Sequence, residues 1–500
     1  MLEVSENSIY DALQSSSDQG EGVFLLDDPP FFKMKTSKLS KEIFLLILTA
    51  IPYSSSLILS YFPNALNLYF ISKNNDLLEI CAIGSFLIVA NITGCLLLNA
   101  LNAEIGKSIS ILNDQPNVSF KAPYNKYTTG LYFHRGMVLG SIFMIFWFIL
   151  LGYLGKIGET FWDLSPEFTG KLEEYALFLL PSIYFSFSFD LTRNLLISCD
   201  VLNLPCSFLI LTIFLHYLFC VLFELEGNFE IKAASFCKNI TDFLNTFLIM
   251  LYAWNLKSLN KVWIPWTSNS FKNLFSHLDF NRLFVKWLET LSYEILNLAV
   301  LLCGNLKEIT PFFIVSCIQT MNFAINQGFS QTVRIIIWKA IREGAINKAK
   351  NRAFLGFLLS IFLALAEWLC FFALKSIVMN SMLKDDLVKV HFLIYSDYYS
   401  LKLFLDVFLV ISIDILKALL KFRVSFNLHI MGFYMGAIIL MGYFSGFEPM
   451  KLIEGLWIGY MLAEISIIII AFVYLCFLVN WKIEINKICL NKLRRNLNKT

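Results

Sequence analysis

The 500-residue sequence predicts an all-α protein that crosses a membrane many times. Hydrophobic residues make up 57% of the chain and charged residues only 16%, whereas a soluble globular protein is usually nearer half apolar and a quarter charged. Apolar runs of about 20 residues, the length that crosses a hydrocarbon core of ~30 Å as a helix, recur along the whole chain. We therefore expect a polytopic membrane protein, and not the several soluble domains that the length alone would allow.

Twelve apolar runs define the expected transmembrane helices. The N-terminal tail, residues 1–41, is polar and contains nothing that resembles a cleavable signal peptide, because the first apolar run begins only near Ile43. A basic tail, residues 481–500, closes the chain. The expected spans are 43–63, 77–101, 129–153, 173–197, 206–226, 229–254, 282–304, 309–331, 352–379, 398–421, 427–447 and 452–480.

The charges of the connecting loops predict the orientation. Lys and Arg gather in both tails and in the connections after the second, sixth, eighth and tenth spans. The alternate connections contain few cations and are often acidic, as in FELEGNFE (Phe223–Glu230). Because cytoplasmic loops of membrane proteins carry an excess of Lys and Arg, both termini are expected in the cytoplasm, with an even number of spans between them.

The longest cytoplasmic connection, residues 255–281, lies at the midpoint and shows little apolar periodicity. It divides the chain into an N-terminal six-helix lobe, residues 42–254, and a C-terminal six-helix lobe, residues 282–480. Such a division is typical of transporters that are built from two related bundles and bind substrate between them.

Other classes of protein find no support in the composition. The eleven cysteines lie almost all inside apolar runs, without a CxxC pair or a Cys/His cluster, and are expected to be small buried hydrophobes. The five histidines are scattered, so we expect neither a metal nor a cofactor. No nucleophile–base set or phosphate-binding loop indicates an enzyme. A net charge of +2, dispersed over short loops, gives no reason to expect a nucleic-acid partner.

Acidic residues inside the expected spans are the strongest functional signal. An ionised carboxylate in a bilayer costs several kcal/mol, so such acids are candidate functional groups. Asp414 lies three residues before Lys417, and an ion pair within one helix would account for it. Glu104 follows the second span closely enough to be interfacial. Asp190, Glu367 and Glu464 have no role that the sequence assigns. The full set is Glu104, Asp190, Glu289, Glu294, Glu367, Asp406, Asp414 and Glu464.

Two of these acids fall within WLETLSYEIL, residues 287–296. Glu289 and Glu294 are five residues apart, or about 140° around a helix, so they do not share one narrow face. Tyr293 does share a face with Glu289, where it can hydrogen-bond a carboxyl group or stack on a substrate. A carboxyl group in a partly apolar cavity exchanges its proton near neutral pH, and an arriving cation favours the ionised form. A proton/cation antiporter requires this chemistry.

The sequence resembles the eukaryotic branch of the MATE family, the multidrug and toxic compound extrusion transporters. WLETLSYEIL is similar to the seventh-helix motif of that branch, and the likeness extends over most of residues 42–481. LYFHRG (Leu131–Gly136) is similar to the start of the third helix, Tyr175–Leu196 to the fourth, and GLWIG (Gly455–Gly459) to the start of the twelfth. The chain departs from the family in the Gly and Asn of the eighth-helix motif, which are absent, and in Lys417, which replaces an Arg.

The resemblance implies two six-helix lobes and the export of organic cations or other xenobiotics in exchange for protons, by alternating access. Glu289 then corresponds to the acid required for proton coupling, Glu294 to the second motif glutamate, and Asp406 to a tenth-helix acid of the same cavity. Glu104 corresponds to the acid that ends the second helix, unless a shift of two residues places Asn102 there. We expect a monomer in the plasma membrane or a vacuolar or endosomal membrane, coupled to protons in preference to sodium.

Two alternatives remain open. A flippase for lipids or lipid-linked sugars would be favoured by a cationic central cavity, which the few Lys and Arg residues inside the spans do not support. A non-transporting receptor or scaffold derived from a transporter is suggested by the lost eighth-helix motif.

Overall fold

The protein is described by a computed structural model that covers residues 36–74, 76–113, 123–162, 165–199, 201, 206–227, 229–260, 262–303, 305–437, 442 and 452–488. Every regular element in these ranges is helical, as the sequence predicts. Most of the expected N-terminal tail and the end of the basic C-terminal tail lie outside the described residues, as does much of the eleventh expected span.

Within the described ranges, helical segments follow the twelve expected spans in order. In the first half of the chain the helices are α2 (Thr36–Lys73), α3 (Leu77–Ala90), the π-helical turn η2 (Asn91–Cys95), α4 (Leu96–Asn113), α5 (Pro123–Gly152), α7 (Pro166–Ser198), α8 (Cys206–Leu225) and α9 (Ile231–Asn255). In the second half they are α11 (Phe280–Asn297), η4 (Leu298–Cys303), α12 (Leu306–Arg342), α13 (Ile346–Met382), α14 (Asp386–Ala418), α15 (Phe422–His429), the π-helix η5 (Ile430–Ala437), α17 (Leu452–Val473) and η7 (Tyr474–Leu478). The predicted all-α fold class is confirmed. The cytoplasmic orientation of both termini stays a prediction.

Eight helical stretches of the described chain are long and apolar enough to cross a membrane by length and composition. Helices α9, α11 and α14 are not among the eight, and each carries several charged residues within its length. Several of the acids singled out above lie on α11 and α14, and the polar faces of these charged helices require partners inside the protein.

Several of these helices begin directly after a residue whose side chain caps the helix N-terminus. Asp76 and Asp279 precede α3 and α11, and their carboxylates accept backbone N–H groups of the first turn. Asn305 does the same for α12, with its Oδ1 3.1 Å from the amide nitrogen of Lys307. These side chains satisfy N–H groups that have no partner within the helix. Helix α7 begins at Pro166, after the capping Ser165.

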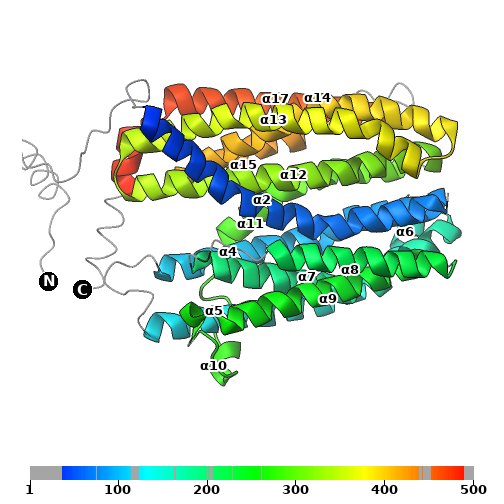
Figure 1. Ribbon diagram of the computed structural model, residues 1–500, viewed down its shortest axis with the longest axis horizontal. Coiled ribbons are helices and arrows are strands. Elements are labelled where there is room, and N and C mark those ends of the chain that lie inside the picture. The colour runs from blue at the N-terminus through cyan, green and yellow to red at the C-terminus, as the bar shows by residue number, and fades with distance from the viewer. Residues whose placement is uncertain are drawn as a thin grey trace, which may run out of the picture.

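The helices form two bundles that lie side by side (Figure 1). In the N-terminal bundle, α7 packs against α3, α4, α5 and α9, and α8 packs against α9. In the C-terminal bundle, α14 packs against α12, α13 and α17. Two further short helices, α6 (Leu154–Trp162) and α10 (Ser268–Phe271), lie outside these main contacts.

Helix α2 belongs to both bundles. In its first half, the carboxylate of Glu42 lies 2.9 Å from Nε of Arg352 on α13, and Ser54 donates to the carbonyl oxygen of Ile325 on α12 at 3.1 Å. In its second half, Asn67 donates to the carbonyl oxygen of Ala234 on α9 at 2.9 Å. Figure 1 shows α2, in dark blue, running from the C-terminal bundle to the N-terminal bundle. Prolines at positions 52 and 63 interrupt its backbone hydrogen bonds between these contacts.

The connection between the bundles is anchored to α5. The imidazole of His134 stacks on Trp266, with ring centroids 4.1 Å apart, and His277 stacks on Tyr132 at 4.5 Å. Arg135 donates to Ser276 Oγ at 3.2 Å. The expected inter-lobe linker is therefore packed against the start of the third span.

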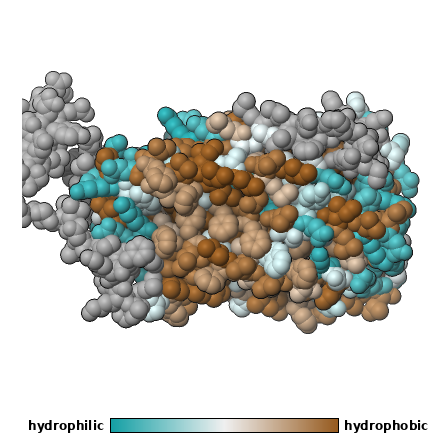
Figure 2. Space-filling model, turned by 90° about the horizontal axis from the view of Figure 1, so that it is seen from above, coloured by the Kyte–Doolittle hydropathy of each residue, from teal (hydrophilic) through white to brown (hydrophobic). Residues whose placement is uncertain are grey.

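The outer surface fits a lipid environment. Figure 2 shows a broad apolar face, with hydrophilic residues gathered toward the two ends. Large apolar side chains such as Ile145, Phe214 and Phe362 are more than half exposed, which a bilayer accommodates and water does not. Cys370 and Cys476 are exposed as well, so the expectation that the cysteines are buried is wrong for these two.

Candidate functional site

Glu289 lies on α11 and is paired with a lysine of α14. Its side chain is buried, its Oε2 is 2.7 Å from Nζ of Lys417, and its Oε1 accepts from Ser425 Oγ at 2.5 Å. The amphipathic pattern of α11 turns Glu289 inward, and Lys417 is close enough to the end of α14 to keep part of its side chain exposed. The acid is thus neutralised by a tethered cation.

Glu294 lies further along α11 and contacts the other bundle. Asn91 of η2 donates to its Oε1 at 2.8 Å, and Asn297 donates to its Oε2 at 3.0 Å. Both carboxylate oxygens therefore accept from neutral amides. Asn91 begins a π-helical turn, a distortion that is frequent at functional sites. The contact joins the two bundles in the middle of the second span.

Asp406 lies on α14 in a separate ionic cluster. Lys402, one turn earlier on the same helix, donates to Asp406 Oδ1 at 2.6 Å and lies 2.9 Å from Oε1 of Glu464 on α17. Lys402 and Glu464 are completely buried. We call Lys402, Asp406 and Glu464 the lysine–carboxylate cluster.

The structure does not bring Glu289 and Asp406 into contact. The partner of Glu289, Lys417, is eleven residues beyond Asp406 on α14, which corresponds to about 16 Å along the helix. Each of the two acids therefore has its own lysine, and they occupy different levels of the C-terminal bundle.

A polar chain connects the lysine–carboxylate cluster to Glu294. The ammonium group of Lys402 lies over the ring of Tyr460, 5.3 Å from its centroid. The Tyr460 hydroxyl donates to Asn297 Oδ1 at 3.1 Å, and Asn297 donates in turn to Glu294. Tyr460 and Asn297 therefore link the lysine–carboxylate cluster to the interface between the two bundles.

A further carboxylate, Glu367 of α13, lies in the same bundle. With its amide nitrogen facing the carboxylate, Asn326 of α12 donates to both oxygens, at 2.8 and 3.2 Å. Nearby, Asn322 donates to the Tyr399 hydroxyl at 2.7 Å. Helix α12 thus supplies neutral amide donors to the centre of the C-terminal bundle.

The remaining expected residues have different surroundings. Glu104 is buried on α4, and one of its oxygens lies 3.9 Å from Arg282, which binds Asp279 more closely. Burial acts to raise the pKa of Asp279, yet the hydrogen bonds from Arg282 hold it below its ordinary value. Asn102, the alternative to Glu104, donates to the carbonyl oxygen of Phe187. Tyr293 lies on α11, but its side chain is outside the part that the structure describes.

The ion pair expected between Asp414 and Lys417 is wrong. Asp414 does not pair with Lys417, because Arg334 of α12 lies 3.1 Å from its Oδ1 and Ser330 donates to its Oδ2 at 2.8 Å. Lys417 points instead to Glu289. Sequence spacing suggested a contact within one helix, whereas packing between helices gives each charge a partner on another helix.

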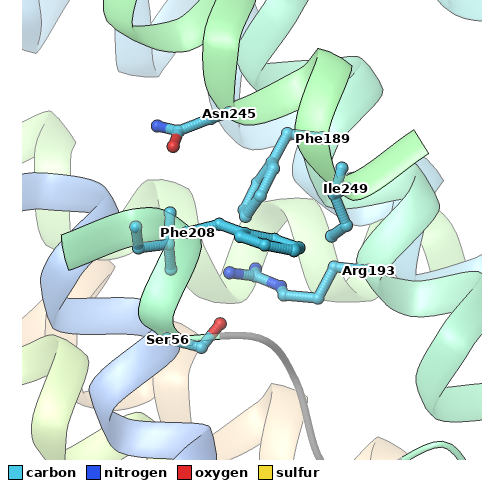
Figure 3. A pocket seen from close by; sticks show the side chains of 7 residues that line it. Ser56, Phe189, Arg193, Phe208, Asn245 and Ile249 are labelled. Carbon is cyan, nitrogen blue, oxygen red and sulfur yellow. The ribbon is translucent and has the colours of Figure 1, made fainter. Parts of the chain in front are cut away.

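The N-terminal bundle has a pocket and charged pairs of its own. Figure 3 shows Arg193 beneath the ring of Phe208, with Asn245 and Ser56 at the edges. Arg193 is held by Asp190 of the same helix at 2.8 Å. None of the acids of the seventh or tenth expected span lines this pocket, which is completed by Phe189, Leu209 and Ile249. Deeper in the bundle, Asp242 pairs with Lys238 at 2.8 Å.

Sequence reasoning missed Lys402 and left Glu464 and Glu367 without a role. A signal for Lys402 was present, because KLFLD places a lysine four residues before Asp406 inside an apolar run. The partners of Glu464 and Glu367 come from other helices, so no local spacing indicates them. Among the described residues, no group of His, Cys, Asp and Glu is arranged to hold a metal ion.

No family model and no curated protein matches the sequence. The structure, however, superposes on solved MATE transporters. The eukaryotic MATE transporter AtDTX14 has a TM-score of 0.68 at 14% identity, over 88% of this chain and 99% of that one. An inward-facing multidrug resistance MATE transporter of the MOP superfamily gives 0.68 at 13% identity, over 86% and 95%. The MATE multidrug transporter DinF-BH gives 0.67 at 16% identity, over 86% and 94%. The chain thus has the MATE transporter fold.

Proposed function

We propose that this chain, a multi-pass membrane protein with the MATE transporter fold, is a secondary active transporter that exports small organic cations or other xenobiotics in exchange for protons. The two bundles serve as the N-terminal and C-terminal lobes expected at residues 42–254 and 282–480, and they rock between states open to either side. The likeness to DinF-BH, a multidrug transporter, supports a small-molecule substrate.

The observation that carries the proposal is the set of buried acids in the C-terminal bundle. Glu289, Glu367, Asp406 and Glu464 are each less than a tenth exposed. Placing charge in such surroundings is costly, so the acids require protons, lysines or a bound cation. Groups that exchange one of these for another couple proton movement to cation movement.

The contacts between the bundles support alternating access. Asn91 and Glu294 join the bundles through a hydrogen bond at 2.8 Å, and Glu42 and Arg352 join them through α2. Contacts of this kind separate and reform at modest cost. Glu294 therefore acts as a contact between the lobes, and Glu289 and Asp406 as groups of the C-terminal lobe.

The test is transport by the purified protein in proteoliposomes. A fluorescent organic cation should accumulate when a pH gradient is imposed, and less so under a sodium gradient of equal size. Collapse of the pH gradient with a protonophore should stop the accumulation. Uptake that follows the sodium gradient alone would replace the proton by sodium, and the absence of uptake under both gradients would refute the antiporter.

A further inference from the structure

In the lysine–carboxylate cluster of the C-terminal bundle, carboxylate groups outnumber ammonium groups. Within the described chain, the lysine–carboxylate cluster pairs a single ammonium group, that of Lys402, with two carboxylates, those of Asp406 and Glu464. All three side chains are at most 4% exposed. With both acids ionised, the cluster would carry one uncompensated negative charge in the membrane.

Glu464 has the less favourable contact with the ammonium group of Lys402. Its Oε1 lies 2.9 Å from Nζ of Lys402, but neither of its oxygens has a hydrogen-bond partner among the described residues. The ammonium group is aligned with Asp406 instead, at 2.6 Å. Glu464 therefore shares a single ammonium group with Asp406, and with both acids ionised Glu464 would be poorly stabilised.

Glu367, another buried acid of the C-terminal bundle, differs from Glu464 in its contacts. Its two oxygens face the amide of Asn326 at 2.8 and 3.2 Å. It is thus satisfied by a neutral donor on a different helix and lies outside the lysine–carboxylate cluster.

We propose that Glu464 carries an exchangeable proton of this transporter and that Lys402 is a tethered counter-ion, occupying the position at Asp406 that a transported cation would take. The proposal rests on the proposed function and assigns a proton carrier to the last span, in addition to Glu289 of α11. Two carboxylates that share one positive charge retain one proton between them.

In the proposed exchange, one proton leaves Glu464 for each monovalent cation that binds. The O–H bond of Glu464 breaks, its electron pair remains on the carboxylate, and the proton leaves to water on the open side. One monovalent cation enters and neutralises the new charge. When the cation leaves, a proton from the opposite side restores the acid.

Other titratable groups surround the cluster. Tyr399 of α14 is hydrogen-bonded by Asn322, and Glu367 lies on α13. On α17 itself, Tyr460 faces Lys402 and connects through Asn297 to Glu294. Phe433 of η5 lies between Tyr460 and His429 of α15, with ring centroids 6.0 and 6.1 Å away. A change of charge at Glu464 thus reaches the bundle interface through Tyr460, which links proton release to the contact between the lobes.

Infrared difference spectroscopy tests the assignment without transport. The full-length protein in lipid nanodiscs is compared between neutral and alkaline pH, and the carbonyl band of a protonated carboxylic acid is recorded. Wild type should show the band at neutral pH. Glu464→Gln should remove one component of this band, and the matched variant Glu367→Gln should retain that component. A spectrum of Glu464→Gln identical to that of wild type, or loss of the same component in Glu367→Gln, overturns the proposal.

Lys402 supplies a second, independent variant. In Lys402→Gln, Asp406 loses its counter-ion and must hold its own proton, so the carbonyl band should grow. An unchanged band would show that Lys402 does not neutralise Asp406 and would overturn its role as counter-ion. This variant also keeps the test valid if Glu464→Gln does not fold, as judged by gel filtration.

Transport measurements distinguish failure of the proposed antiport function from failure of the assignment of Glu464. With a fluorescent organic cation and an imposed pH gradient, Glu464→Gln should lose uptake and Glu367→Gln should retain it. If wild type itself shows no uptake driven by pH, the antiport function fails, while the infrared experiment still decides whether Glu464 is protonated. If wild type and Glu464→Gln transport equally, the function stands and the assignment of Glu464 falls.

Discussion

Nζ of Lys417 lies 2.7 Å from Oε2 of Glu289, and this contact joins the last turn of α14 to the middle of α11. The two residues are far apart in the sequence, and each had a different expected partner. Ser425 of α15 completes the arrangement by donating to the other carboxylate oxygen. Three helices of the C-terminal bundle therefore meet at one acid, and a bound cation would compete with the lysine for its carboxylate.

Glu289→Gln should abolish pH-driven export while leaving folding and membrane insertion intact. Glutamine keeps the shape of the side chain and its bond with Ser425 but cannot exchange a proton or neutralise Lys417. Initial efflux rates in proteoliposomes provide the measurement. The double variant Glu289→Gln with Lys417→Met controls for the lysine that the single change leaves unpaired. Rates equal to wild type would show that Glu289 is not required for coupling, and Asp406 would be examined next.

Glu294→Gln should harm transport less than Glu289→Gln. The carboxylate of Glu294 accepts from two amides, those of Asn91 and Asn297. A glutamine offers one acceptor oxygen, so one of these bonds is lost, at a cost of about 1–3 kcal/mol if the amide is left unsatisfied. Thermal unfolding in detergent should shift downward while pH-driven uptake persists. Complete loss of uptake would instead give Glu294 the coupling role.

Asp414 and Arg334 should show an energetic coupling that Asp414 and Lys417 lack. The pair between α12 and α14 is partly exposed at Arg334, so removing either side chain should lower the free energy of unfolding by about 1 kcal/mol. Double-mutant cycles with Asp414→Asn, Arg334→Gln and Lys417→Gln provide the measurement. A coupling of Asp414 with Lys417 that exceeds the coupling with Arg334 would contradict the observed pairing.

The linker should detach from α5 as the pH falls below about 6.5. Burial, assisted by the charge of Arg135, lowers the pKa of His277 from 6.5 to about 4. Since the folded-state pKa is depressed, His277 stabilises the docked linker fully above pH 6.5, and this contribution is lost between pH 6.5 and 4. Neither ring nitrogen has a hydrogen-bond partner among the described residues, so a proton there would be unsatisfied.

Proteolysis of the linker in nanodiscs, at pH 7 and at pH 5, measures this detachment. His277→Phe preserves stacking on Tyr132 and removes the titration, so its linker should be cut equally at both pH values. A wild-type linker that resists cleavage equally at pH 5 and pH 7 would contradict the role of His277.

The helices and their order were predictable because each needs an apolar run long enough to cross the bilayer, and such runs are local features of a sequence. The identity of the acids was predictable for the same reason, since a carboxylate is conspicuous among leucines and phenylalanines. Their partners were not, because Glu289 meets Lys417, and Glu464 meets Lys402, across helices that no spacing connects. The mistaken pairing of Asp414 has this origin, and only the packing of α12 against α14 corrects it.

The position of α2 determines how the chain can be divided. A cut within residues 255–281 would separate the polypeptide at its longest connection, yet the upstream fragment would retain a helix whose first half is built to contact Ile325 and Arg352 of the downstream fragment. Two co-expressed halves should therefore recognise each other in the membrane and reconstitute a whole molecule. An upstream half expressed alone would expose the unmatched carboxylate of Glu42 and become a substrate for quality-control proteolysis.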